Sequence, residues 1–114
     1  MLADKNRLKK KKDFENILKK GRTFKEDFLV LKVIKNKEKK IRFGFIVSKK
    51  ISLKAIVRNK VKRRLRESVK PKIELLKKGV DIVVISLPGI REKSFKEIEK
   101  IIIKLLKRTG FLEL

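Results

Sequence analysis

A large excess of positive charge constrains this chain more than any other feature of its sequence. The 114 residues hold 36 Lys and Arg against 13 Asp and Glu, which gives a formal net charge of +23. Repulsion on that scale opposes a compact fold and is typical of proteins that bind a polyanion. Because 41% of the residues are hydrophobic, one core is still available. The sequence therefore predicts a single domain over residues 1–114 with a polyanionic partner.

The amino-acid composition excludes several classes of protein. The chain contains no Cys and no His, which removes disulfides, thiolate metal sites, a cysteine nucleophile and the commonest general base. No apolar run approaches the ~20 residues that a membrane span needs, and no apolar segment typical of a secretory signal follows the N-terminus. These observations predict a cytoplasmic protein with no metal site and no membrane partner.

The N-terminal region combines cations with one amphipathic segment. Residues 1–11 are polar and basic, with six cations between Lys5 and Lys12, which is typical of a flexible basic arm or of a strand that follows an RNA backbone. Apolar residues at helical spacing predict a short helix over residues 12–20. Gly21 then suits a left-handed C-terminal cap.

Three or four segments have the pattern of β-strands. Residues 28–34 form a mostly apolar run, and residues 41–48 alternate between apolar and other side chains. The charged linker 35–40 suits a hairpin loop between them, and residues 22–24 can add an edge strand. A continuous β-branched run at residues 82–87 predicts an interior strand that is covered on both faces.

A second helix is predicted over residues 52–69. Ser52 is a suitable N-cap, and Ile51 is placed to pack against Ile56 as a hydrophobic staple. The helix should end before Pro71, because the residue before a proline is disfavoured in the helical conformation.

The last predicted helix begins at a capping box formed by Ser94 and Glu97. An apolar stripe follows at helical spacing, and Gly110 ends the helix. The element order is α-β-β-β-α-β-α. Because a strand, a helix and an interior strand follow one another, we predict a parallel βαβ crossover and an α+β fold, an α/β sandwich with a mixed four-stranded sheet.

The segment from Lys49 to Arg66 contains nine Lys and Arg in eighteen residues and no acid before Glu67. On a helix, a narrow apolar seam would face the sheet and the remaining surface would be cationic. Charged helix faces are usually only solvated, but those normally alternate in sign, whereas like charges here stand four residues apart. The interpretation as a membrane-surface helix has even less support, because the apolar seam is needed for the core. The residues predicted to bind the polyanion, and RNA by the resemblance described next, are Lys54, Arg58, Asn59, Lys60, Lys62, Arg63, Arg64 and Arg66.

This segment resembles a known signature. Arg58-Asn59-Lys60 with the cations after it, preceded by Val47-Ser48-Lys49-Lys50, is similar to the RNR signature of the bacterial ribonuclease P protein subunit. Further matches are Asn6-Arg7-Leu8-Lys9-Lys10, Asp13-Phe14 and Gly21, so the resemblance spans nearly the whole chain. Lys60 replaces the second arginine of the signature, which keeps the charge but loses the bidentate guanidinium.

The resemblance implies a specific function. The protein subunit binds a large catalytic RNA, with one protein per RNA, and the holoenzyme removes the 5′ leader of precursor tRNA. Hydrolysis belongs to the RNA and its bound Mg²⁺, so no catalytic residue and no protein-bound cofactor are expected in this chain. The resemblance also implies a left-handed βαβ crossover, although general handedness rules favour a right-handed one.

The resemblance implies two RNA-contacting surfaces, one on the cationic helix and one in a cleft between the first helix and the sheet. The cleft would receive the single-stranded leader. Phe14 would be its aromatic residue, although the apolar stripe around Phe14 also suits a core position. The expected cleft residues are Phe14, Leu18, Leu31, Ser48, Lys49 and Lys50, and the expected N-terminal contacts are Arg7, Lys9, Lys10 and Lys12.

Two other functions remain open from the sequence. A non-enzymatic RNA-binding protein, such as a ribosomal protein or an RNA chaperone, would share the size and charge but would not need the spaced motifs. Leader removal by ribonuclease P RNA at low Mg²⁺ with the protein added would separate the two. A stand-alone nuclease would need paired acids beside the basic surface, and the sequence shows no such pair.

Overall fold

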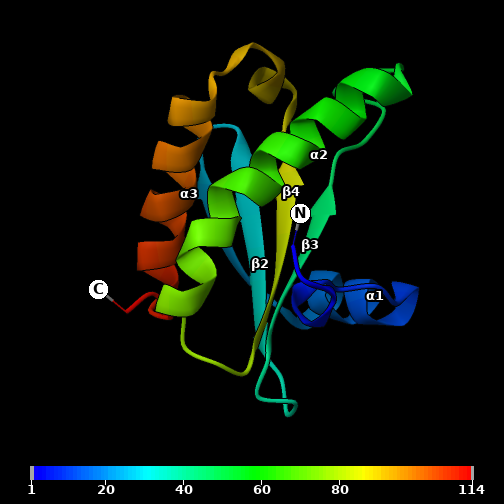
Figure 1. Cartoon of the computed structure of the whole chain (residues 1–114). Helices are drawn as coiled ribbons and strands as arrows, with labels where there is room; N and C mark the ends of the chain where they lie inside the picture. Colours follow the sequence, from blue (N-terminus) through cyan, green and yellow to red (C-terminus); the bar gives the residue numbers. More distant parts are fainter. Residues whose placement is uncertain (1, 114) are drawn as a thin grey trace.

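The computed structural model describes residues 2–113 and contains the predicted sequence of helices and strands (Figure 1). The α+β fold class is therefore confirmed. The helices and strands are α1 (Lys11–Lys20), β1 (Arg22–Glu26), β2 (Leu29–Lys35), β3 (Ile41–Ile46), α2 (Ala55–Val69), β4 (Val80–Ser86) and α3 (Phe95–Thr109), and three short 3₁₀ helices lie at Asp4–Asn6, Lys70–Leu75 and Pro88–Glu92.

The four strands form one mixed sheet in the order β1-β2-β4-β3. β2 is antiparallel to both β1 and β4, whereas β3 is parallel to β4, so α2 provides the predicted crossover between parallel neighbours. The left hand of this crossover stays a prediction. The predicted hairpin between β2 and β3 is wrong, because β4 lies between them. All but one residue of β4 is buried, because its two edges are paired with β2 and β3 and helices cover both of its faces.

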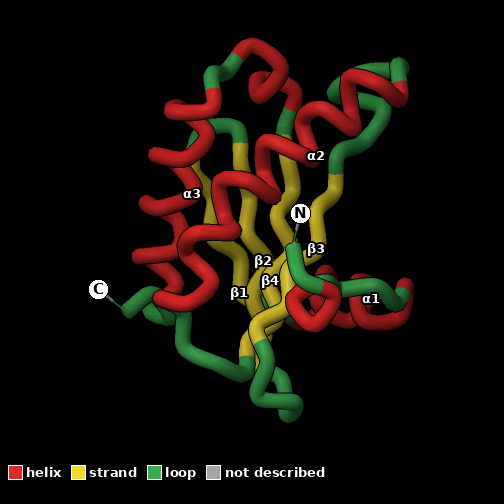
Figure 2. Tube along the Cα trace, in the orientation of Figure 1, coloured by secondary structure: helices red, strands yellow, loops and turns green. Residues whose placement is uncertain are grey.

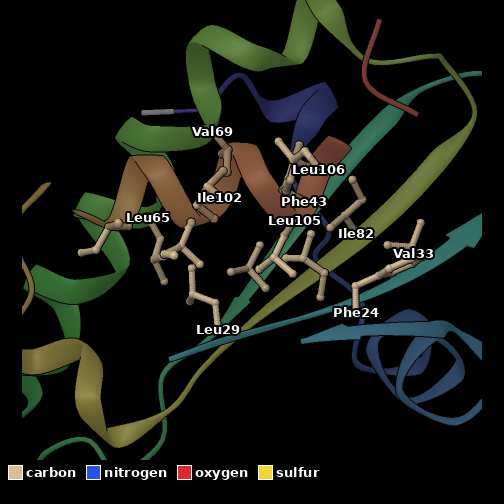
Figure 3. Close-up of a cluster of buried hydrophobic side chains, with 14 of the residues drawn as sticks. Phe24, Leu29, Val33, Phe43, Leu65, Val69, Ile82, Ile102, Leu105 and Leu106 are labelled. Atoms are coloured by element: carbon tan, nitrogen blue, oxygen red, sulfur yellow. The ribbon is translucent and has the colours of Figure 1, made fainter. Parts of the chain in front are cut away.

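Two layers of helix cover the sheet. α2 and α3 lie on one face, and α1 lies on the other (Figure 2). The main core fills the α2–α3 side, where side chains of both helices point toward those of the strands (Figure 3). The predicted narrow seam of α2 is present, since only Val61, Leu65, Ser68 and Val69 of that helix are buried. Each large side chain buried in this way contributes about 1.5–3 kcal/mol.

The ends of α3 follow the predicted signals. The Ser94 hydroxyl accepts a hydrogen bond from the Glu97 N–H at 3.2 Å, and the Glu97 carboxylate accepts one from the Ser94 N–H at 3.4 Å. Gly110 has a φ of 81°, the left-handed conformation of a helix C-cap. The capping box and the terminating glycine are both confirmed.

Gly21 does not have the predicted left-handed conformation, since its φ is −68°. The glycine serves close packing instead. A Cβ at this position would lie 2.6 Å from the carbonyl oxygen of Ile17 and 3.2 Å from the backbone nitrogen of Val33. The missing side chain therefore lets the end of α1 approach β2.

The predicted start of α2 is also wrong. The helix begins at Ala55 after the N-cap Lys54, and the Ser52 hydroxyl accepts a hydrogen bond from the Lys54 N–H in a turn before the helix. The staple does not form, because Ile51 is buried whereas Ile56 points into solvent.

The N-terminal segment is packed against β3 rather than detached as a flexible arm. Leu2 and Leu8 are buried, and the Leu8 N–H donates to the Phe43 carbonyl at 2.8 Å. The Asn6 side chain donates to the Ile41 carbonyl at 2.7 Å. Leu2 and Leu8, the two buried apolar residues among the cations, thus anchor the segment on the free edge of β3. Met1 lies outside the described residues.

Candidate RNA interface

An ion-pair network links α1 to the strands β3 and β4. The Arg42 guanidinium of β3 makes two hydrogen bonds with the buried Asp81 carboxylate of β4, at 2.7 and 2.8 Å. Arg42 also lies 3.1 Å from Glu38 and 3.8 Å from Asp13 of α1. These carboxylates, Asp81 foremost, raise the pKa of Arg42 above its ordinary value. The network therefore holds one side of α1 over the start of β3.

Strand register arranges the α1 face of the sheet in three rows. Arg42, Asp81 and Ile34 form the first row, and Gly44, Val83 and Lys32 form the second. α1 packs over these two rows, where its Phe14 ring lies on Gly44 and its Ile17 packs with Val83. A Cβ at position 44 would lie 2.4 Å from the Phe14 ring. The glycine is thus required by the close approach of α1.

The third row consists of Ile46, Ile85 and Val30, and we call it the open row. All three side chains are only half-buried. At about 100° per residue, Leu18 lies on the side of α1 opposite Asp13, which places it toward the open row. Leu18 is 38% exposed. An apolar strip therefore borders α1, and it consists of one residue from each of the three strands β2, β4 and β3.

One predicted cleft residue is wrong. Leu31 has no exposed surface and belongs to the main core on the α2–α3 side. Side chains alternate along a strand, so the neighbouring Val30 occupies the α1 face instead. The other expected cleft residues lie around the open row or beyond it. Phe14 is half-buried, and Ser48, Lys49 and Lys50 are exposed in the turn after β3.

Sequence reasoning missed the open row itself. The alternation over residues 41–48 already places Ile46 opposite the core-facing side chains, so a signal for that residue was present. No local pattern identifies Val30 and Ile85, because each belongs to a continuous apolar run.

α2 presents its cations on three sides. Asn59, Lys60 and Arg63 are exposed on the outer side, and Lys62 and Arg66 are half-buried on the side of β3. Arg64 lies on the opposite flank, where its guanidinium is 3.4 Å from the Lys93 carbonyl. Within residues 2–113, no ion pair includes a cation from α2. The cations of this helix therefore have no ion-pair partner in that part of the chain.

Arg58 has an internal role that the sequence did not indicate. Its Nη1 donates to the carbonyls of Ser52 at 3.0 Å and Leu53 at 2.9 Å. The first arginine of the signature therefore holds the turn before α2.

A small hollow of about 110 Å³ connects α2 with the N-terminal segment. Arg7, Lys62 and Arg66 line it, together with the rings of Phe14 and Phe45. Three cations from distant parts of the sequence thus meet at the edge of β3. Among the other expected N-terminal contacts, Lys9 pairs with Asp4, while Lys10 and Lys12 are exposed around the first turn of α1.

Between residues 2 and 113 there is no group of three His, Cys, Asp or Glu side chains that could hold a metal ion. No helix in that part of the chain is long and apolar enough to cross a membrane.

Solved structures share this architecture. The ribonuclease P protein of Staphylococcus aureus superposes with a TM-score of 0.86 at 32% identity, over 95% of this chain and 98% of that one. The ribonuclease P protein of Thermotoga maritima superposes with a TM-score of 0.81 at 33% identity, over 90% of this chain and 96% of its own. The fold is that of bacterial ribonuclease P proteins.

Sequence comparison agrees along nearly the whole chain. The family described as Ribonuclease P matches residues 2–110. The ribonuclease P protein component of Clostridium botulinum strain 657 is 39% identical over 106 residues, 92% of this chain and 95% of that protein. That of Clostridioides difficile is 43% identical over 103 residues, 90% of each chain. The chain belongs to the ribonuclease P protein family.

It is accordingly the protein component of a ribonucleoprotein endoribonuclease that processes tRNA, and its partner is a ribonuclease P RNA. Nothing in the comparisons favours a ribosomal protein or an RNA chaperone.

Proposed function

We propose that α2 binds the catalytic RNA and that the open row binds the 5′ leader of precursor tRNA, with one protein per RNA. The observation that carries the first part is that the cations of α2 have no ion-pair partner within residues 2–113. Guanidinium and ammonium groups on a rigid helix can contact successive phosphates without first ordering a loop. Arg7 extends the same surface through the hollow that it shares with Lys62 and Arg66.

The geometry of the open row supports the second part. Ile46, Ile85 and Val30 provide an apolar surface for bases or sugars, with Leu18 beside it. Lys25 pairs with Val30 in the sheet and continues the row at its β1 end, while the lysines of the turn after β3 follow at the other end. A single strand with unstacked bases fits such a surface, whereas a duplex hides its base faces.

The proposal assigns hydrolysis to the RNA and the Mg²⁺ that the RNA holds. This agrees with a chain that contains neither His nor Cys. The protein would hold the RNA and the leader in place, in the cytoplasm, and perform no bond-breaking step itself.

Lys62→Gln combined with Arg66→Gln tests the contact between α2 and the RNA. Gln removes the charge and keeps a good helix propensity. We expect weaker binding to ribonuclease P RNA and a slope of log K against log salt that is flatter by roughly 0.7–0.9 for each lost contact. Lys100→Gln with Lys107→Gln is the matched control, since it removes the same charge from exposed positions of another helix, α3. Equal losses in both double variants would show that only net charge matters.

A pair of opposite charges at position 30 tests the leader site. Val30→Glu should weaken binding of a precursor tRNA with a long leader, because the carboxylate repels the leader phosphates, and Val30→Lys should strengthen it, because the ammonium attracts them. Mature tRNA should bind both variants alike. A purely structural effect would change the affinity of both variants for precursor tRNA in the same direction, and that result would contradict the assignment.

A further inference from the structure

Two large aliphatic side chains project into solvent at the start of α2. Leu53 is 82% exposed and Ile56 is 83% exposed, whereas the next large apolar side chain in the described residues, Leu75, is 40% exposed. Figure 1 shows this end of α2 extending past the edge of the sheet beside β3. Within residues 2–113, no other element covers Leu53 and Ile56, which we call the apolar tip.

The backbone under the apolar tip is held firmly. Arg58 donates to the carbonyls of Ser52 and Leu53, and the Ser52 hydroxyl accepts from the Lys54 N–H at 3.1 Å. Ile51, 2% exposed, anchors the same turn in the core. The two side chains are therefore presented by an ordered support, which lowers the entropy cost of binding.

The charge around the apolar tip selects its partner. Lys49, Lys50 and Lys54 precede Ile56, and no acid occurs between Glu38 and Glu67. Lys60 and Arg63 follow at four and seven residues, so they share the outer side of the helix with Ile56. A second copy of this chain would bring its own charge of +23 and be repelled. The partner must combine dense negative charge with apolar surface.

We propose that the apolar tip packs against unpaired bases of the ribonuclease P RNA while the neighbouring cations contact the flanking phosphates. Unpaired nucleotides offer both features at once, because their base faces are open and their phosphates remain charged. Arg58 is a positioning residue that fixes the tip. The inference rests on the proposed function, and it adds a contact that does not depend on charge.

The test replaces Leu53 and Ile56 together by Ser and measures affinity for ribonuclease P RNA at several salt concentrations. Ser and Ile have similar helix propensities, and both positions are exposed, so the melting temperature should not change. We expect about a tenfold loss of affinity at every salt concentration, with the slope of log K against log salt unchanged. Lys60→Gln with Arg63→Gln on the same helix side is the matched control, and it should flatten the slope. Unchanged affinity of the Ser variant would overturn the proposal.

Two further measurements separate the sources of failure. If wild-type protein binds the RNA and the charge variants lose affinity while the Ser variant does not, only the apolar tip is refuted. If the charge variants also bind like wild type, the proposed function fails as well. Loss of binding to phosphatidylglycerol vesicles with unchanged RNA affinity would assign the tip to a membrane surface and overturn the proposal.

A double-mutant cycle tests the role of Arg58. Its replacement by Gln should reduce RNA affinity less in the Ser background than in the wild type, because the tip that it positions is already absent. Equal losses in both backgrounds would show that Arg58 acts only as a direct contact.

Discussion

Gly44→Ala should destabilise the protein, although alanine is the better residue for a strand. The new Cβ would lie 2.4 Å from the Phe14 ring and 3.2 Å from a Leu8 methyl group. Overpacking of this kind costs about 1–3 kcal/mol, whereas the reduced freedom of the unfolded chain returns only about 0.4–1 kcal/mol. The net loss should lower the melting temperature by several degrees, at about 4 °C per kcal/mol for a domain of this size.

The sign of the effect should reverse when the ring is removed. In a Phe14→Ala background, the severe clash disappears and only the flexible Leu8 side chain remains close. Gly44→Ala should then be neutral or stabilising by up to about 1 kcal/mol, which gives a coupling energy of roughly 1–3 kcal/mol between the two sites. Urea unfolding of the four proteins measures it. Additive effects of the two substitutions would refute the placement of Phe14 over Gly44.

Two further predictions concern stability. Arg42→Met should cost about 3–5 kcal/mol in urea unfolding, because it removes the cation beside the buried Asp81 carboxylate and leaves it the Asn36 amide as a side-chain hydrogen-bond donor. Adding Asp81→Leu should recover most of that loss, and no recovery would contradict the ion-pair argument. The Ser94 N–H and hydroxyl hold the pKa of Glu97 below its ordinary value. The stabilisation is therefore present above the pKa of the unfolded chain and is lost as pH falls through the lower folded value. The difference in melting temperature between wild type and Glu97→Gln should accordingly shrink from pH 7 to pH 3, and a constant difference would argue against the cap.

Elements whose formation depends on residues nearby in the sequence could be predicted. The capping box, the apolar stripe of α3 and the β-branched run of β4 each contain their own signal within a few residues. The order of the strands in the sheet could not be predicted in this way, because it depends on which segment buries most apolar surface at an interior position. The charged linker 35–40 looks like a hairpin loop, yet Asn36 and Lys40 hydrogen-bond to Gly79 at the start of β4. Nothing within the linker indicates that β4 enters between its two strands.

The candidate site was predictable on α2 and only partly at the leader cleft. In a helix with a narrow apolar seam, all positions outside the seam face solvent, so the exposed cations follow from the spacing of the apolar residues. β2 is different, because its apolar run lacks alternation. Leu31 and Val30 are both apolar, and a shift of one residue exchanges the two faces of a strand. Burial alone decides between them, and it places Leu31 in the core.

The distribution of acids explains how so basic a chain folds and still binds a polyanion. Asp13, Glu38 and Asp81 converge on Arg42 and hold α1, while Glu26 pairs with Lys104 and Arg108 of α3. The few acids thus fix the outer helices to the sheet and leave the like charges of α2 facing one another. That repulsion weakens the free protein, and phosphates of the RNA would relieve it at the same surface that they bind. Ligands that bind only the folded state stabilise it by mass action, so the proposed contact between α2 and the RNA would couple stability to RNA affinity.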